Sequence, residues 1–263
     1  MNQLQNYPTA VDKTMHKLKE QDILRRVWEH DHTVWKEDST EISNRLGWLD
    51  IAKRMLPEVE RLQGFVNEVQ KDGFTQALLL GMGGSSLAAE VLRNTFGVKP
   101  RFLELSVLDS TDPGAVLHFE RELNPQKSLY IVSTKSGGTV ETFSFMRYFY
   151  NLLAGQIGPE DAGRHFIAIT DPGSQLAAVA ERFHFRKVFL NDPNIGGRYS
   201  ALSYFGLVPA ALLGMDIEKL LRNALQAMKA NGSEIAVETS TAAVLGASMG
   251  ELAKLGRDKL TLV

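Results

Sequence analysis

The chain has 263 residues, a formal net charge of -2 and no cysteine. Its 29 basic and 31 acidic residues are dispersed, so there is no electrostatic footprint for nucleic acid or an anionic membrane. The lack of cysteine excludes disulfides, thiolate metal sites and thiol nucleophiles. No apolar run reaches the ~18 residues that span a bilayer, and the polar start is unlike a signal peptide. We therefore expect a cytoplasmic protein without a membrane partner.

The first 74 residues predict helices. Between Val11 and Glu37 apolar residues recur near helical spacing, which indicates one amphipathic helix. Trp48–Lys53 and Leu56–Gln70 continue this pattern, and Pro57 suits a first helical turn. We therefore expect residues 1–74 to form an N-terminal helical segment.

Short apolar runs then alternate with helix-like segments. The runs are Ala77–Gly81, Phe102–Leu108, Leu129–Val132, His165–Ile169 and the weaker Val188–Leu190. Runs of this length between helical segments are typical of βαβ units, in which strands are buried on both faces. The sequence therefore predicts an α/β fold around a parallel sheet.

Helical stretches close the chain at roughly 199–213, 217–230 and 239–255, followed by the strand-like Lys259–Val263. A buried strand needs neighbours, and no partner follows within the sequence. We therefore expect 257–263 to be the start of a further domain, with a natural edge strand as the alternative.

The motif Ser133–Thr142 follows the third apolar run and precedes a helix-like segment. Three hydroxyls and one ammonium stand close together in it, at Thr134, Lys135, Ser136 and Thr139. The glycine pair 137–138 allows a tight turn, and the helix would aim its N–H groups at an anion. We call Thr134–Thr139 the cradle and interpret it as a site for a small monophosphate. The alternative is an ordinary βα turn with a Ser/Thr cap.

Two other glycine-rich turns accompany the cradle. The first glycine turn, Gly81–Leu87, lacks the third glycine of a dinucleotide fingerprint, so a nucleotide-binding domain is disfavoured. It either brings backbone N–H groups and Ser85 to a ligand or only caps a helix. The arginine turn, Asn194–Ser200, places Arg198 where it reaches an oxyanion or phosphate, or where it is an ordinary surface residue.

General acid and base groups are harder to place. The six histidines show no metal-ligand spacing, no Ser-His-Asp arrangement is evident, and we expect neither a metal nor a cofactor. Glu141 lies at the start of the helix after the cradle, where the dipole also favours a carboxylate. The sequence thus predicts a binding site without a complete set of catalytic residues.

Taken in this order, the three glycine-rich turns resemble glucose-6-phosphate isomerases over most of 75–263. The resemblance implies a sugar isomerase (SIS) domain at 75–256, with a flavodoxin-like five-stranded parallel sheet and helices on both faces. It implies that Arg198 stabilises a cis-enediolate and that Glu141 supports the ring-opening histidine. The residues that it places on the sugar phosphate are Gly84, Ser85, Thr134, Lys135, Ser136 and Thr139.

The chain also departs from this family. Pro193-Asn194 replaces the usual residues before the Gly-Gly-Arg turn, and Leu46–Leu49 looks more like the isomerase half of bacterial transaldolase fusions. The resemblance implies a second SIS domain as partner in the parent chain and a homodimer of the full-length protein. That second domain supplies the catalytic Glu, the ring-opening His and a C-terminal Lys, so we expect 1–263 alone to be inactive. The alternative function is a regulatory module that senses a phosphosugar without chemistry.

Overall fold

The computed structural model describes residues 7–261. It divides into two compact units: a sheet unit, residues 44–222, and a helical unit made of the described parts of 1–43 and 223–263. Helices α3 (Ile51–Met55) and α4 (Val59–Lys71) belong to the sheet unit, so the observed division differs from the expected boundary at residue 74. Within residues 7–261, no helix is long and apolar enough to cross a membrane.

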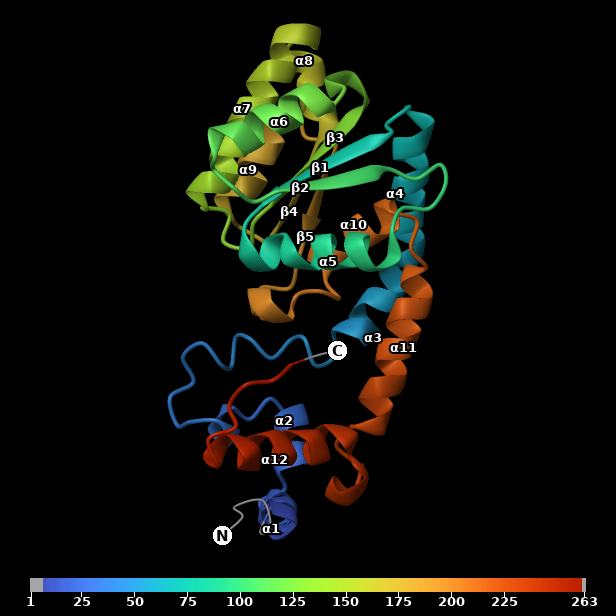
Figure 1. Cartoon of the computed structure of the whole chain (residues 1–263). Helices are drawn as coiled ribbons and strands as arrows, with labels where there is room; N and C mark the ends of the chain where they lie inside the picture. The colour runs from blue at the N-terminus through green and yellow to red at the C-terminus, as the bar shows by residue number, and fades with distance from the viewer. Residues whose placement is uncertain (1–6, 262–263) are drawn as a thin grey trace. The chain divides into compact units, whose positions relative to one another are not determined.

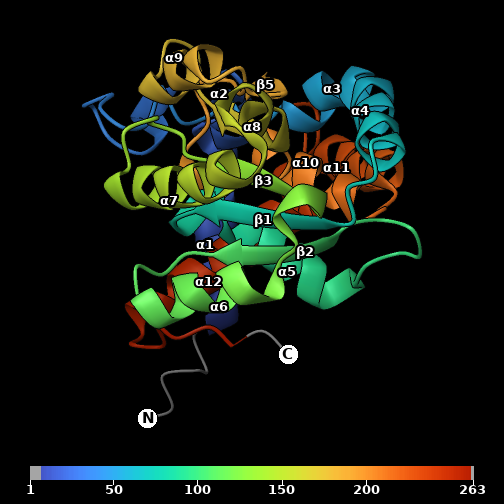
Figure 2. The same ribbon diagram turned by 90° about the horizontal axis from the view of Figure 1, so that it is seen from above.

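The sheet unit is built on five parallel strands in the order β2-β1-β3-β4-β5, and Figure 2 shows β2, β1 and β3 in succession. The strands are β1 (Gln76–Gly81), β2 (Glu104–Leu108), β3 (Ser128–Ser133), β4 (Phe166–Thr170) and β5 (Lys187–Leu190). In the register, Leu79 pairs with Val107 on one side and with Ile131 on the other. All five predicted strands are confirmed, as is the flavodoxin-like order.

Helices cover both faces of this sheet, as expected (Figure 1). One face carries α6 (Pro113–Glu122), α7 (Val140–Ile157) and α9 (Gln175–Arg182), and the short α8 (Pro159–Ala162) follows α7. The opposite face carries α4, α5 (Leu87–Phe96) and α10 (Tyr204–Leu212). Side chains fix several helix starts: Asp112 accepts from the N–H of Ala115 at 3.0 Å, and Ser174 accepts from that of Ala177 at 3.2 Å.

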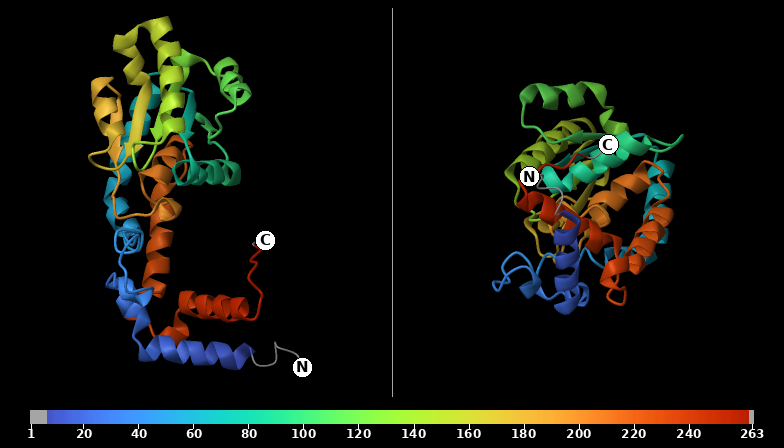
Figure 3. Two further views of the ribbon diagram at one scale, coloured as in Figure 1. Left: turned by 90° about the vertical axis from the view of Figure 1, so that its left-hand side faces the viewer. Right: turned by 60° about the horizontal axis from the view of Figure 1, so that its bottom comes forward.

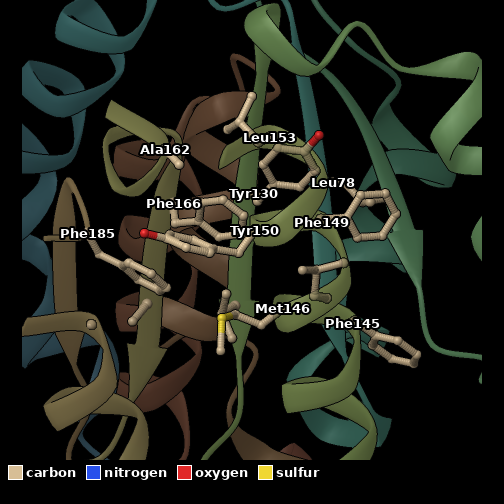
Figure 4. Packing of buried hydrophobic residues seen from close by; sticks show 14 of the residues in the cluster. Leu78, Tyr130, Phe145, Met146, Phe149, Tyr150, Leu153, Ala162, Phe166 and Phe185 are labelled. Carbon is tan, nitrogen blue, oxygen red and sulfur yellow. The ribbon is translucent and has the colours of Figure 1, made fainter. Parts of the chain in front are cut away.

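Aromatic packing fixes the α7 face of the sheet (Figure 4). Tyr130 of β3 is fully buried and stacks on Phe166 of β4 at 4.8 Å and on Phe149 of α7 at 5.3 Å between ring centroids. Burying one such side chain contributes about 1.5–3 kcal/mol, and an aromatic pair adds about 0.5–1.5 kcal/mol. β3 and β4 therefore lie on a rigidly packed aromatic layer, and the loops that follow their carboxyl ends start from well-fixed strands.

The helical unit combines both ends of the described chain. Figure 3 shows α1 (Tyr7–Glu20) beside α12 (Thr241–Lys254), where the Thr14 hydroxyl donates to Glu251 at 2.7 Å. In the same unit, Trp28 of α2 (Ile23–Trp28) donates its indole N–H to the carbonyl of Asn231 at 2.7 Å. The boundary after residue 222 falls within α11 (Ile217–Ala230).

Three local predictions were wrong. The helix expected over 11–37 is divided, because Asp22 (φ 53°) and His30 (φ 60°) adopt left-handed backbone conformations that an α-helix does not accept. The helix expected from residue 199 begins only at Tyr204, after a 3₁₀ turn at Gly197–Tyr199. Lys259–Thr261 forms no strand, and the remaining two residues of that prediction lie outside the described chain.

Candidate functional site

The site lies where the strands end. In an open parallel sheet, ligands bind outside the carboxyl ends of the strands, at the point where the strand order reverses. Here the order reverses between β1 and β3, because α5 follows β1 on one face and α7 follows β3 on the other. The first glycine turn follows β1 and the cradle follows β3, so both lie at this switch point.

The cradle folds through its glycines and hydroxyls. Gly137 has φ +65°, a conformation that favours glycine, and an added Cβ would lie only 2.8 Å from Oγ of Ser174. Thr134 is buried, and its Oγ1 lies 2.9 Å from Oγ1 of Thr139. Ser136 is exposed, and its hydroxyl oxygen accepts from the N–H of Gly138 at 3.3 Å. The Ser136 O–H therefore remains able to donate to a ligand.

The cradle ends on the N-terminus of α7. Thr139 is the N-cap residue, yet its side chain does not cap the helix and instead meets Thr134. No side chain of the cap therefore occupies the first N–H groups of α7, where a helix presents its positive dipole end. Glu141 lies in this first turn, half-buried, with no hydrogen-bond or ion-pair partner among residues 7–261.

Lys135 points its ammonium at protein atoms. Its Nζ contacts the carboxylate of Asp171, which follows β4, and donates to the carbonyl of Pro193 at 2.9 Å. Both charged side chains are largely shielded, with 23% and 15% exposed. Burial raises the pKa of the Asp171 carboxyl above its usual value, while the Lys135 ammonium acts in the opposite direction.

The arginine turn packs directly on the first glycine turn. A Cβ on Gly84 would lie 2.6 Å from the carbonyl carbon of Gly197, so only glycine permits this approach. The Ser200 hydroxyl contacts the carbonyl oxygens of Gly197 at 2.6 Å and Gly84 at 3.3 Å. On the other side, the hydroxyl of Ser133 donates to the carbonyl of Ser85 at 2.7 Å. The three turns thus form one connected structure.

The segment before α3 supports the arginine turn. Leu46 forms a β-bridge with Ile195, and the N–H of Gly47 donates to the carbonyl of Asn194 at 2.9 Å. Trp48 stacks on Tyr199, with ring centroids 5.3 Å apart and an interplanar angle of 19°. Arg198 itself is exposed, and no partner for its guanidinium is found within residues 7–261. It is therefore free to meet a ligand oxygen.

A second support comes from Arg54, on α3. Its guanidinium contacts the carboxylate of Asp192 and donates to Asp50 at 2.7 Å. The same Asp192 accepts from the N–H of Asn194 at 2.8 Å. Burial acts to raise the pKa of Asp192, but its bonds to Asn194 and Arg54 outweigh burial and lower that pKa overall. Together these bonds hold the segment between β5 and the arginine turn.

The structure thus brings together the first glycine turn, the arginine turn and the cradle, and it pairs Lys135 with a carboxylate. Sequence reasoning missed Asp171, although the Asp-Pro pair directly after an apolar run was a visible signal. It also missed Arg54 and Asp192, which no local motif marks. Among residues 7–261, no group of three His, Asp or Glu side chains is placed to hold a metal.

These features define a class: a doubly wound α/β protein with turns rich in glycine and hydroxyl groups at the carboxyl edge of its sheet. Comparison with known proteins identifies the family, since the phosphoglucose isomerase family matches residues 50–251. Glucose-6-phosphate isomerase from Thermus thermophilus is 36% identical over 199 residues, 74% of this chain and 45% of that protein. The Mycoplasmopsis pulmonis enzyme is 30% identical over 190 residues, 69% of this chain and 44% of that protein. The chain belongs to the phosphoglucose isomerase family.

Solved structures agree on the fold. A crystal structure of a hypothetical protein from Thermus thermophilus has a TM-score of 0.74 and 30% identity, and covers 97% of this chain and 56% of that one. A glucose-6-phosphate isomerase from Chlamydia trachomatis has a TM-score of 0.61 at 24% identity, with 89% and 42% covered. The chain spans about half the length of the curated relatives that it matches.

Proposed function

We propose that this chain is the sugar-phosphate-binding SIS portion of a glucose-6-phosphate isomerase, which interconverts glucose 6-phosphate and fructose 6-phosphate. The observation that carries the proposal is the packing of Gly84 on Gly197 beside the cradle. Together with the bond from Ser133 to Ser85, this packing connects a candidate anion site, at the Ser136 hydroxyl and the start of α7, to a turn whose guanidinium has no partner among residues 7–261. A hexose 6-phosphate carries the matching groups: a phosphate at one end and an oxygen that becomes negative at the other.

Each proposed residue has a separate task. The hydroxyls of Thr134, Ser136 and Thr139, with the remaining donor of Lys135, bind the phosphate oxygens. Gly84 and Ser85 line the substrate from the first glycine turn. These groups position the sugar and leave the proton transfer to others.

Arg198 stabilises the charge that develops on the enediolate oxygen during aldose–ketose proton transfer. The backbone that carries Arg198 is held by a short turn, and its guanidinium has no partner among residues 7–261 that it would have to leave. Glu141 orients the ring-opening histidine, which we assign to a second SIS domain of the parent chain. That domain also carries the Glu that moves the proton and a C-terminal Lys, and the full-length protein is a homodimer.

Binding of fructose 6-phosphate, measured by titration calorimetry, tests the phosphate assignment. Ser136→Ala should weaken binding by about 1 kcal/mol through loss of one hydrogen bond, or by up to about 3 kcal/mol if that bond is charge-assisted. Ser144→Ala is the matched control, since this exposed hydroxyl on α7 donates to the carbonyl of Val140 instead. Equal affinities of wild type and Ser136→Ala would remove Ser136 from the site, and binding of fructose as tight as that of its phosphate would refute the proposal.

The chain alone should not isomerise fructose 6-phosphate, because we assign the Glu that moves the proton, the ring-opening His and the C-terminal Lys to the second domain. A coupled assay that detects glucose 6-phosphate measures this directly. Robust turnover by the purified chain would show that its own residues include a catalytic base. Tight binding without turnover, at micromolar concentration or below, would instead support the sensing module.

A further inference from the structure

We propose that Asp171 is a positioning residue: through Lys135 it fastens the arginine turn to the cradle. Arg198 is thereby kept at a fixed position relative to a phosphate bound in the cradle. The inference rests on the proposed function for its ligand, but the fastening itself is a property of the protein. It concerns three loops, which follow β3, β4 and β5 and carry Lys135, Asp171 and Pro193.

Lys135 is the only side chain seen to join all three loops among the described residues. Its ammonium contacts the Asp171 carboxylate and donates to the Pro193 carbonyl at 2.9 Å. The backbone supports the same arrangement, because the N–H of Asp171 donates to the carbonyl of Lys135 at 3.3 Å. With two of three ammonium donors used on protein atoms, most of the directional bonding of Lys135 serves the loops.

Asp171 depends on Lys135 in turn. One of its carboxylate oxygens is bonded to Lys135, whereas the other is buried and has no hydrogen-bond partner within residues 7–261. Asn191 directly follows β5, its N–H donates to the carbonyl of Thr170 at 2.9 Å, and its side-chain nitrogen is also buried without a partner among residues 7–261. A largely shielded carboxylate with so few donors depends on the ion pair with Lys135, and this pair in turn fixes the ammonium in place.

The Lys135 bond adds to the other supports of the arginine turn. Gly197 packs on Gly84 within the turn, and the carbonyl of Pro193, directly before the turn, accepts from Lys135. The ion pair also offsets the positive charge that Lys135 would otherwise offer to a phosphate. Loss of Asp171 should therefore free the ammonium for phosphate but loosen the loop that carries Arg198.

Two probes separate these effects: inorganic phosphate, which needs only the cradle, and 6-phosphogluconate, whose carboxylate also reaches toward Arg198. In Asp171→Ala, phosphate should bind as well as in wild type or more tightly, while the preference for 6-phosphogluconate over phosphate should fall by about fivefold or more. In an Arg198→Ala background, Asp171→Ala should no longer change this preference. Asp171→Asn should retain part of the preference that Asp171→Ala loses. Asp161→Ala, which removes an exposed carboxylate paired with Arg164 at 3.4 Å, is the control.

An equal loss of affinity for both probes, or no change in either, would overturn the proposal. Amide hydrogen exchange of the chain without ligand provides a second readout: Asp171→Ala should speed exchange in residues 194–199 and leave α7 unchanged. If wild type binds neither probe, the proposed function fails, yet faster exchange confined to 194–199 still supports the fastening, and unchanged exchange refutes it. If Asp171→Ala does not fold, Lys135→Met removes the same link from the other side, with the same expected exchange.

Discussion

Replacing Gly84 with alanine tests the contact on which the site depends. An ideal Cβ on Gly84 would lie 2.6 Å from the carbonyl carbon and 3.1 Å from the Cα of Gly197. Ordinary contact begins near 3.4 Å, so the backbone of one turn must move by several tenths of an ångström. Such overpacking typically costs about 1–3 kcal/mol, and the lower entropy of the unfolded alanine chain offsets about 0.4–1 kcal/mol of that.

We therefore expect Gly84→Ala to lower the free energy of unfolding by about 1–2 kcal/mol. Urea unfolding can be followed through Trp48, which stacks on Tyr199 in the arginine turn, after Trp28 and Trp35 are replaced by phenylalanine. Since the two removed tryptophans lie in the helical unit, the remaining signal reports the sheet unit.

Gly197→Ala is the matched control, because it lies on the other side of the same contact. A Cβ there meets nothing within 4 Å, and the backbone is not in the left-handed region. This variant should stay within about 0.5 kcal/mol of wild type. If Gly84→Ala is as stable as the control, the two turns do not touch as described.

Two further predictions concern the interior. Thr142→Val should raise the free energy of unfolding by about 1 kcal/mol, because the Thr142 hydroxyl is fully buried and has no partner in the described part of the chain. A loss of stability in urea unfolding would show that this hydroxyl is bonded. Burial lowers the pKa of His165 below its usual 6.5, so the folded state binds its proton less readily than the unfolded state. Stability from this group is present above pH 6.5 and is lost as the pH falls from 6.5 through the lower folded pKa. His165→Gln should flatten that part of the pH profile of unfolding, and NMR titration of the ring should give a pKa below 6.5; a ring pKa at or above 6.5 would contradict it.

The sheet was predicted well because its strands are short apolar runs, and such runs between helices form strands buried on both faces of a parallel sheet. Leu87–Phe96 and Ile217–Ala230 were located to the residue, since glycine or a polar turn stands at their ends. The broken N-terminal helix was missed because Asp22 and His30 adopt left-handed backbone through their surroundings, which apolar spacing does not encode.

The residue types of the site could be predicted from the sequence, but the contacts between them could not. Glycines and hydroxyls in the cradle indicate an anion site by local chemistry alone. The ion pair of Lys135 with Asp171 joins residues 36 positions apart, and the contact of Gly84 with Gly197 spans a still longer stretch. Such contacts depend on which strands are neighbours, and the register of β3 with β4 is set by the whole sheet.

The order of synthesis gives the two-unit division a consequence for folding. The sheet unit is one uninterrupted stretch, whereas the helical unit needs both ends of the chain, as the 237-position separation of Thr14 and Glu251 shows. During translation, which proceeds at about 5–20 residues per second, residues 44–222 emerge and can fold while α1 still lacks α12. Until α12 has been made, α1 therefore lacks the helix against which it mainly packs, and a nascent chain stalled before residue 241 should show a protease-resistant sheet unit with a cleavable N-terminus.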